Sequence, residues 1–282
     1  MGYLEKIILQ EDTRNISKLK EFLHENFLDE AAKKISTKRG KVFIVTGFFI
    51  SYANSPETDG PPGALAIGFA LKQLGFEIIY ITDKWSFSMI KGLLSEKDTL
   101  INFPVTSHSE SDSFSKKLIE KYSPSMVISI ERASFVEDGT YRNWKQEDVS
   151  KYNAKIDYLF TPSLYSIGIG DGGNEIGMGN LSEKIKSIKG LPDQPSITKV
   201  DDLIISSCSN WGAFGLIAAI SKIKKQNLLL SVEQVKKIII KSVDLGAVEG
   251  LSGKKIYAVD GRGLKEDSKC LDQLHNYIDL VI

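Results

Sequence analysis

The sequence has few cysteines and histidines, the residues that build disulfides, thiolate sites and imidazole sites. Only two cysteines occur in 282 residues. Cys208 and Cys270 lie far apart and form no CxxC pair, which argues against a disulfide framework and a thiolate zinc site. The three histidines, His24, His108 and His275, are scattered as well, which disfavours a histidine triad or a histidine zinc site. Chemistry is therefore expected to depend on carboxylates, arginine, tyrosine and amides.

An excess of one charge and long apolar runs are also absent. Lysine plus arginine and aspartate plus glutamate each total 36, so no net field draws the chain to nucleic acid or a membrane. A small-molecule substrate is the expected partner. No stretch of about 20 apolar residues is present, and charges interrupt the apolar runs at the N-terminus. We therefore expect no signal peptide, no membrane span and a cytoplasmic location. The oligomeric state stays open, with a homo-oligomer among the alternatives.

Segments with strand and helix patterns alternate along most of the chain. Apolar, β-branched runs predict strands at 41–50, 76–82, 99–103, 126–130 and 202–206, with helices between them and near the C-terminus. Strands and helices that alternate in this way form a parallel sheet with right-handed crossovers. The expected fold is α/β, with a mainly parallel sheet, helices on both faces and a Rossmann-like three-layer architecture.

No internal repeat or low-complexity linker divides the sequence, so residues 1–282 are expected to form a single α/β domain. Residues 3–38 are charge-rich and have apolar positions at helical intervals. We expect residues 1–38 to form peripheral helices that contribute packing and no chemistry. Ser231 and Gln234 have the spacing of a capping box and predict the start of a helix that ends at Gly246.

Polar motifs follow the predicted strands, at the edge where open parallel sheets bind ligands. The segment ETDGPPG at 57–63 presents two carboxylates before a helix, and Asp59 serves there either as a helix cap or as a site residue. At the end of another strand, Glu131 and Arg132 offer an acid/base group and a guanidinium for a substrate carboxylate, unless they form a surface pair. An acidic turn around Asp138 follows.

Residues 168–179 (GIGDGGNEIGMG) contain six glycines around Asp171, Asn174 and Glu175. Such glycine density predicts a close approach of the backbone to a ligand. The formal GxGxxG match does not indicate a dinucleotide site, because Asp171 falls where the pyrophosphate would bind and the preceding segment is a poor strand. No organic cofactor is expected.

Two further polar segments occur near the C-terminal half of the chain. In SSCSNWG at 206–212, Asn210 either caps the next helix or lines a pocket, and Cys208 has no nearby histidine to activate it. Residues 244–250 and Asp260-Gly261 place more carboxylates beside glycines. Acidic groups that converge in one cleft either hold a divalent cation such as Mg or Mn or raise one another's pKa for acid/base work. The candidate metal ligands are Glu57, Asp59, Glu131, Asp138, Asp171 and Glu175.

Taken together, these motifs resemble the D-glutamate cyclase family over nearly the whole chain. The matching segments, in family order, are ETDGPPGA from Glu57, SIERA from Ser129, DGTYRNW from Asp138, GIGDGGNEIGMG from Gly168, SNWGAFGL from Ser209 and GAVEG from Gly246. The sequence departs from the family pattern at Trp144, Lys145 and Gln146. The resemblance implies a lyase that converts D-glutamate to 5-oxo-D-proline and water.

For that reaction, a base must take a proton from the α-amine and an acid must help to expel water. In this hypothesis, Arg132 binds the α-carboxylate of the substrate. Asp171 or Glu175 acts as the base, and Asp59 and Asp138 supply the acid or hold a metal. The candidate catalytic residues are thus Asp59, Asp138, Asp171 and Glu175, and the candidate substrate-binding residues are Arg132, Tyr141, Asn143, Gly172, Gly173, Asn174 and Asn210.

Two other classes of function use the same residues. A metal-dependent hydrolase or phosphatase would activate water at the acidic cluster. A non-catalytic protein would bind an acidic metabolite without turnover.

Overall fold

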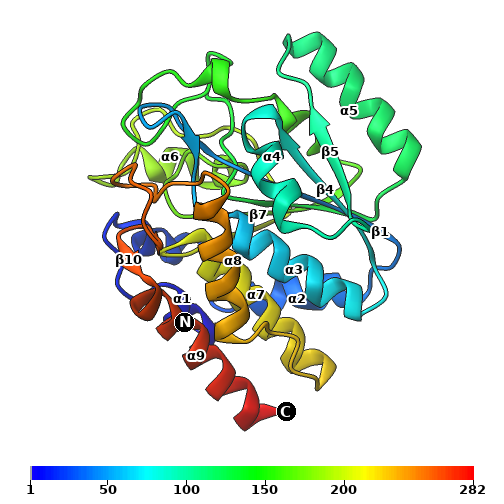
Figure 1. Ribbon diagram of the computed structural model, residues 1–282, viewed down its shortest axis with the longest axis vertical. Helices are drawn as coiled ribbons and strands as arrows, with labels where there is room; N and C mark the ends of the chain where they lie inside the picture. Colours follow the sequence, from blue (N-terminus) through cyan, green and yellow to red (C-terminus); the bar gives the residue numbers. More distant parts are fainter. Residues whose placement is uncertain (1) are drawn as a thin grey trace.

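Six parallel strands form one sheet in the computed structural model, which describes residues 2–282 (Figure 1). The strands are β1 (Lys41–Thr46), β4 (Glu77–Asp83), β5 (Thr99–Phe103), β6 (Met126–Ile130), β7 (Tyr165–Gly170) and β8 (Asp202–Ile205). Their spatial order is β5-β4-β1-β6-β7-β8, which is the doubly wound order of a Rossmann-like sheet. The predicted α/β fold is confirmed.

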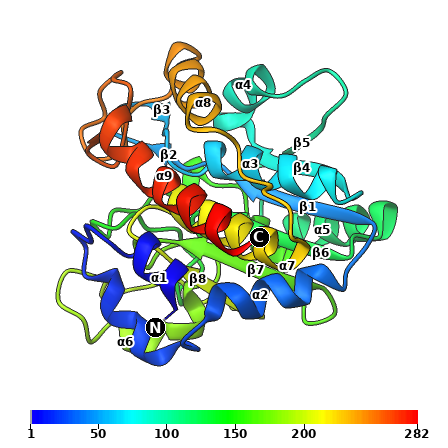
Figure 2. The same cartoon turned by 90° about the horizontal axis from the view of Figure 1, so that it is seen from below.

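Side chains alternate between the two faces of the sheet, and a separate layer of helices covers each face. On one face, Ile44 and Ile128 belong to a buried cluster with residues of α1 (Tyr3–Ile8), α2 (Phe27–Ser36), α3 (Pro61–Gln73), α7 (Ser209–Lys224), α8 (Val232–Asp244) and α9 (Leu264–Val281) (Figure 2). On the other, Phe43 and Val127 pack against α5 (His108–Tyr122) and η3 (Ile156–Leu159). Because both faces are buried, the central strands are mainly apolar on both sides and do not alternate with polar residues.

The remaining elements are short or peripheral. They are η1 (Ile16–Phe22), β2 (Phe49–Ile50), β3 (Ser55–Pro56), α4 (Lys84–Leu93), η2 (Ser150–Tyr152), η4 (Met178–Leu181), α6 (Ser182–Ile185), β9 (Ala258–Val259) and β10 (Arg262–Gly263). Helix α8 begins at the predicted capping box of Ser231 and Gln234. Within residues 2–282, no helix is long and apolar enough to cross a membrane.

Strand β7 corrects the expectation that the segment before the glycine-rich motif is a poor strand. Gly168 and Gly170 belong to this strand, which lies in the sheet between β6 and β8. A Cβ atom on Gly168 would lie 2.4 Å from the carbonyl oxygen of Ile176. The glycine therefore lets the strand pack against the backbone of the loop that follows it, and the low strand propensity is outweighed by tertiary packing.

The strand order reverses between β1 and β6, which are neighbours although β4 and β5 come between them in sequence. In open α/β sheets, a crevice opens beyond the carboxyl ends of the strands at this point. The chain leaves β1 at Gly47 and leaves β6 at Glu131. The fold therefore directs the first two predicted motifs to one crevice.

Asp267 on α9 is buried against α7 and makes folding depend on pH. Its side chain accepts a hydrogen bond of 2.9 Å from Trp211 Nε1. Burial raises the pKa of Asp267 to about 6, and Arg262 partly opposes this rise. A carboxyl whose pKa is higher in the folded state binds protons more tightly there. The free energy of unfolding therefore falls as pH rises from 3.8, the ordinary pKa of aspartate, through about 6, its pKa in the folded protein.

We expect Asp267→Asn to remove this part of the pH dependence. Between about pH 5 and about pH 7.5, the decrease in the free energy of unfolding should be smaller than in the wild type by about 1 kcal/mol. Urea denaturation of both proteins at both pH values measures this decrease. Asp272→Asn, on the exposed side of the same helix, is the matched control and should leave the decrease unchanged. An Asp267→Asn variant with the full wild-type pH dependence would contradict the assignment.

Candidate functional site

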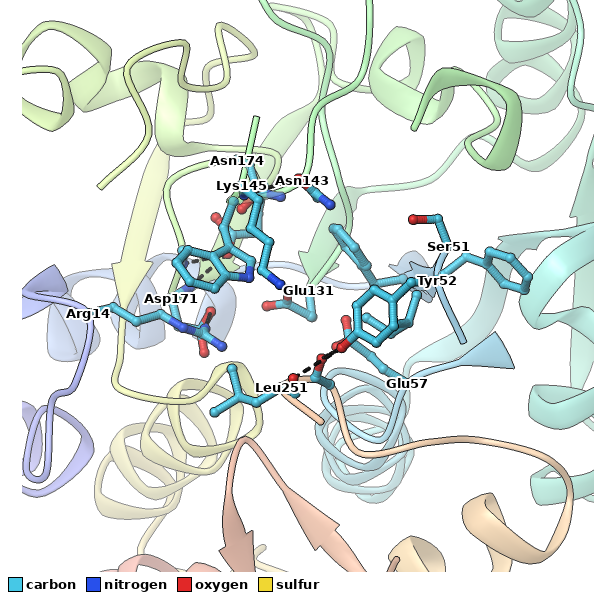
Figure 3. A pocket seen from close by; sticks show the side chains of 17 residues that line it. Arg14, Ser51, Tyr52, Glu57, Glu131, Asn143, Lys145, Asp171, Asn174 and Leu251 are labelled. Carbon is cyan, nitrogen blue, oxygen red and sulfur yellow. Dashed lines mark hydrogen bonds and ion pairs between the residues drawn. The ribbon is translucent and has the colours of Figure 1, made fainter. Parts of the chain in front are cut away.

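Carboxylates from three loops converge beyond the carboxyl edge of the sheet. Glu57 follows β3, Glu131 follows β6, and Asp171 and Glu175 follow β7. All four are buried and line one pocket of about 50 Å³ (Figure 3). Tyr52 lines the same pocket. Its hydroxyl donates to the carbonyl oxygens of residues 250 and 251, which holds its ring across part of the pocket opening. The structure thus brings four predicted site residues together.

Asp59 lies beneath this pocket at the N-terminus of α7. Its Oδ1 accepts hydrogen bonds from the backbone N–H groups of Gly60 at 2.9 Å and Asn210 at 2.8 Å, and its Oδ2 accepts from Ser209 N–H at 2.9 Å. Burial and the nearby Asp260 raise the pKa of Asp59 to about 7, against the effect of these hydrogen bonds. The capping role is therefore real, but the capped helix is α7, not the helix that follows Asp59 in sequence.

Glu131 has an unusual backbone at the end of β6. Its φ of 45° lies in the left-handed region, which is disfavoured for residues other than glycine and is often found at functional sites. Ser209 Oγ donates a 2.5 Å hydrogen bond to its Oε2. Burial and the charges of Asp171 and Glu175 raise the pKa of Glu131 well above its usual value. This environment favours the protonated form of Glu131.

Glu57 and Asp171 each present a buried carboxylate oxygen that has no hydrogen-bond partner, Oε1 and Oδ2 respectively. Buried polar atoms in proteins are almost always paired, so unpaired ones facing a pocket mark a place for a ligand or a proton. Burial raises the pKa of both groups well above the usual value, with Asp260 adding to the effect on Glu57 and Arg14 opposing it on Asp171.

Glu175 organises the glycine-rich loop. Its Oε1 accepts hydrogen bonds from Asp171 N–H at 3.1 Å and Gly172 N–H at 2.6 Å, and its Oε2 accepts from Gly173 N–H at 2.8 Å. Gly173 has a φ of +92°, which favours glycine. The glycines let the loop wrap around this carboxylate. As a correction, the amides of Gly172 and Gly173 bind Glu175, and Gly172 lines the pocket without offering its N–H to a substrate.

Arg132 is placed differently from the sequence-based expectation. Its side chain is 1% exposed. Nη1 donates to the carbonyl oxygen of Gly47 at 2.7 Å, and Nη2 donates to Asp83 Oδ2 at 2.5 Å and to the carbonyl oxygen of Ala154 at 3.0 Å. The guanidinium therefore joins the ends of β1 and β4 to residue 154 and does not line the pocket.

Three more predicted residues lie outside the pocket. Asp138 is exposed in a turn, where it accepts from Thr140 and pairs with Arg142. Tyr141 is buried, and its hydroxyl donates to Asp157. Asn210 holds the loop at the start of α3, because its Oδ1 accepts from the backbone N–H groups of residues 60 and 63 at 3.1 and 2.8 Å. The corrections for Tyr141 and Asn210 follow from partners elsewhere in the chain, whereas Asp138 is held by its own turn.

Asn143 and Asn174 do line the pocket, together with Trp144 and Lys145. Asn143 Oδ1 accepts from the backbone N–H groups of Lys145 and Glu147, each at 3.0 Å. This turn presents Trp144 and Lys145 at the rim. The departures from the family pattern at 144 and 145 therefore lie on the pocket itself and not only at the edge of a loop.

Arg14 is a pocket residue that the motifs do not reveal. It lies between α1 and η1, where Asp12 accepts a 2.9 Å hydrogen bond from its backbone N–H. Its guanidinium pairs through Nη1 with Asp171 and through Nη2 with Asp260 at 3.2 Å. Residues 1–38 therefore contribute more than packing. The sequence carries no signal for this, because position 14 meets position 171 only in three dimensions.

Oxygen atoms of Asp59, Glu131 and Asp171 lie within 4.8 Å of one another. Carboxylate oxygens are the donors that Mg²⁺ and Mn²⁺ prefer, and Asp171 Oδ2 has no other partner. These residues therefore fit a divalent cation in donor type. Arg14 already supplies positive charge to the same cluster.

Comparison with known proteins shows which family the chain is similar to. Residues 4–275 match the family described as D-glutamate cyclase-like, C-terminal. A human protein, D-glutamate cyclase, mitochondrial, is 31% identical to this chain over 198 residues. The alignment covers 64% of this chain and 32% of the human protein, so the chain spans about a third of the length of that relative. The resemblance drawn from the motifs is confirmed, and the chain belongs to the D-glutamate cyclase-like, C-terminal family.

Proposed function

We propose that this chain is a lyase that cyclises D-glutamate to 5-oxo-D-proline and water. Its human relative is named for D-glutamate cyclase activity. The observation that carries the proposal is the group of buried carboxyls at the pocket, in which burial raises the pKa of Glu57 and Glu131. Such groups remain protonated at a pH where free carboxyls are ionised, which is the property that this reaction needs.

The reaction joins the α-nitrogen to the carbon of the γ-carboxylate and breaks one of the two C–O bonds of that carbon. The α-ammonium group loses two protons in the process, and the departing oxygen leaves with two protons as water. No net proton is gained or lost. An ionised γ-carboxylate is a poor electrophile, so in the acid/base route it must be protonated before the nitrogen attacks it. The site must therefore supply an acid and a base at the same time.

Glu131 is the acid in this proposal. Its protonated carboxyl lines the pocket and accepts a hydrogen bond from Ser209 at Oε2, so its other oxygen is available to the γ-carboxylate. Asp171 is the base, because its unpaired Oδ2 faces the same pocket. Asn143 and Asn174 supply amides at the wall. Holding the nitrogen near the carbon of the γ-carboxylate would contribute about 7 kcal/mol or more to lowering the barrier.

A divalent cation is compatible with this proposal. Asp59, Glu131 and Asp171 would hold it. When bound, it would polarise the γ-carboxylate as a Lewis acid.

The test is incubation of purified protein with D-glutamate and, separately, with L-glutamate. 5-Oxoproline is followed by chiral chromatography, with and without EDTA. We expect 5-oxo-D-proline from the D-isomer and no product from the L-isomer. Activity that is lost in EDTA and restored by magnesium or manganese would assign the carboxylates to a metal, whereas EDTA-resistant activity would assign them to acid/base work.

An absence of product in every condition, added magnesium and manganese included, would contradict the cyclase proposal. Phosphate-ester hydrolysis that requires metal would then favour a hydrolase. Binding of D-glutamate without turnover would favour a metabolite-binding protein.

A further inference from the structure

We propose that Arg14 binds the α-carboxylate of the substrate, and that the substrate takes the place of Asp171 as the partner of the Arg14 guanidinium. The inference rests on the proposed function and identifies the group that selects an α-amino acid with a free α-carboxylate. It assigns to the loop between α1 and η1 the role that the sequence alone assigned to Arg132.

The first support is the position of Arg14 in the pocket. Figure 3 shows its side chain extending to Asp171 at the wall of the cavity. Nη2 pairs with Asp260 at 3.2 Å, so the guanidinium has an anchor that does not involve Asp171. An arginine can therefore keep one carboxylate partner and exchange the other.

The second support is the unequal pairing of Asp171. Its Oδ1 pairs with Arg14, while its buried Oδ2 has no partner. A substrate that places a carboxylate on Arg14 and its ammonium group beside Asp171 satisfies both oxygens of Asp171. The exchange replaces one ion pair with two, so the ligand satisfies a buried polar atom that has no partner within the protein.

The third support is the scarcity of other cations in the pocket. Among the residues of 2–282 that line it, only Arg14 and Lys145 are cationic. Lys145 is exposed and lies near the rings of Tyr52 and Trp144, at 5.5 and 5.7 Å from their centroids. Arg14 has a side chain that is only 20% exposed. A less hydrated, forked guanidinium binds a carboxylate better than a mobile ammonium group at the rim.

The α-carboxylate is the matching part of the substrate because it remains charged from D-glutamate to 5-oxo-D-proline. The γ-carboxylate must instead be protonated and lose an oxygen. A permanent cation beside the γ-carboxylate would oppose its protonation, whereas one beside the α-carboxylate is equally useful before and after ring closure.

The experiment compares D-glutamate with its α-carboxamide, in which the α-carboxylate is replaced by an uncharged amide. The ratio of kcat/KM for the two substrates is measured in the wild type, Arg14→Gln and Lys145→Gln. We expect wild type to prefer D-glutamate by about 100-fold, Arg14→Gln to reduce this ratio to near one, and Lys145→Gln to reduce it by less than about 5-fold. Arg14→Lys should retain part of the preference, because it keeps the charge and loses the fork.

A structural role for Arg14 predicts a different pattern, in which both substrates lose activity equally and the ratio stays at its wild-type value. That result overturns the proposal, as does a wild type that treats the two substrates alike or a ratio that collapses in Lys145→Gln instead. Should the wild type form no product, the cyclase proposal fails, and calorimetric binding of the same two compounds to wild type and Arg14→Gln supplies the ratio. Absence of binding as well overturns both.

Discussion

Glu131→Gln is expected to lower kcat for D-glutamate cyclisation by about 100- to 10,000-fold, the usual contribution of a positioned acid. Glutamine has nearly the same shape as glutamic acid, so the loop after β6 keeps its geometry. The amide can still accept from Ser209 Oγ. It cannot transfer a proton to the γ-carboxylate, and the carbonyl of that group then remains a poor electrophile. Chiral chromatography of 5-oxo-D-proline under saturating D-glutamate measures the loss.

A measurement of stability distinguishes the loss of the acid from a loss of activity through misfolding. Burial and neighbouring carboxylates disfavour ionised Glu131, so Glu131→Gln should be at least as stable as the wild type above neutral pH in urea denaturation. Glu137→Gln, at an exposed position after the same strand, is the matched control and should keep wild-type kcat. A Glu131→Gln variant that retains more than half of the activity would remove Glu131 from the role of acid.

The sheet was largely predictable because its strands are buried on both faces. Segments such as 41–46 and 126–130 are mainly apolar, and that pattern is typical of parallel strands under two helical layers. Strand β7 was not predicted, because glycines and not large apolar side chains allow it to pack in the sheet. Gly168 contributes close packing against the backbone at residue 176, which no propensity scale or hydrophobic period records.

The acidic part of the site was predictable for a related reason. Glu131 and Asp171 directly follow parallel strands, which end at one edge of the sheet, and Glu57 lies in the connection from parallel strand β1 to α3. The partners of long side chains were not predictable. Arg132 and Arg14 are both arginines in polar surroundings, yet one binds the scaffold at Asp83 and the other reaches the pocket. Which way a guanidinium points depends on contacts between distant segments, and these exist only in the folded chain.

Arg132→Met should reduce the free energy of unfolding by about 3 to 5 kcal/mol, the usual effect of removing one partner from a buried ion pair. Arg132 and Asp83 each have a side chain that is 1% exposed. Methionine fills much of the same volume but leaves the Asp83 carboxylate without its cation. It also leaves the carbonyl oxygens of Gly47 and Ala154 without the donors that Arg132 supplies. Equilibrium denaturation in urea measures the change.

A double-mutant cycle separates this loss from other effects of the substitution. Asp83→Asn removes the buried charge, so Arg132→Met should destabilise the Asp83→Asn protein less than it destabilises the wild type, by about 1 to 3 kcal/mol. Arg39→Met, at an exposed position before β1, should change stability by less than about 0.5 kcal/mol. Equal losses in both backgrounds would show that Arg132 and Asp83 do not act as a pair. If Arg132→Met instead kept wild-type stability and raised KM for D-glutamate, the guanidinium would serve the substrate and not the scaffold.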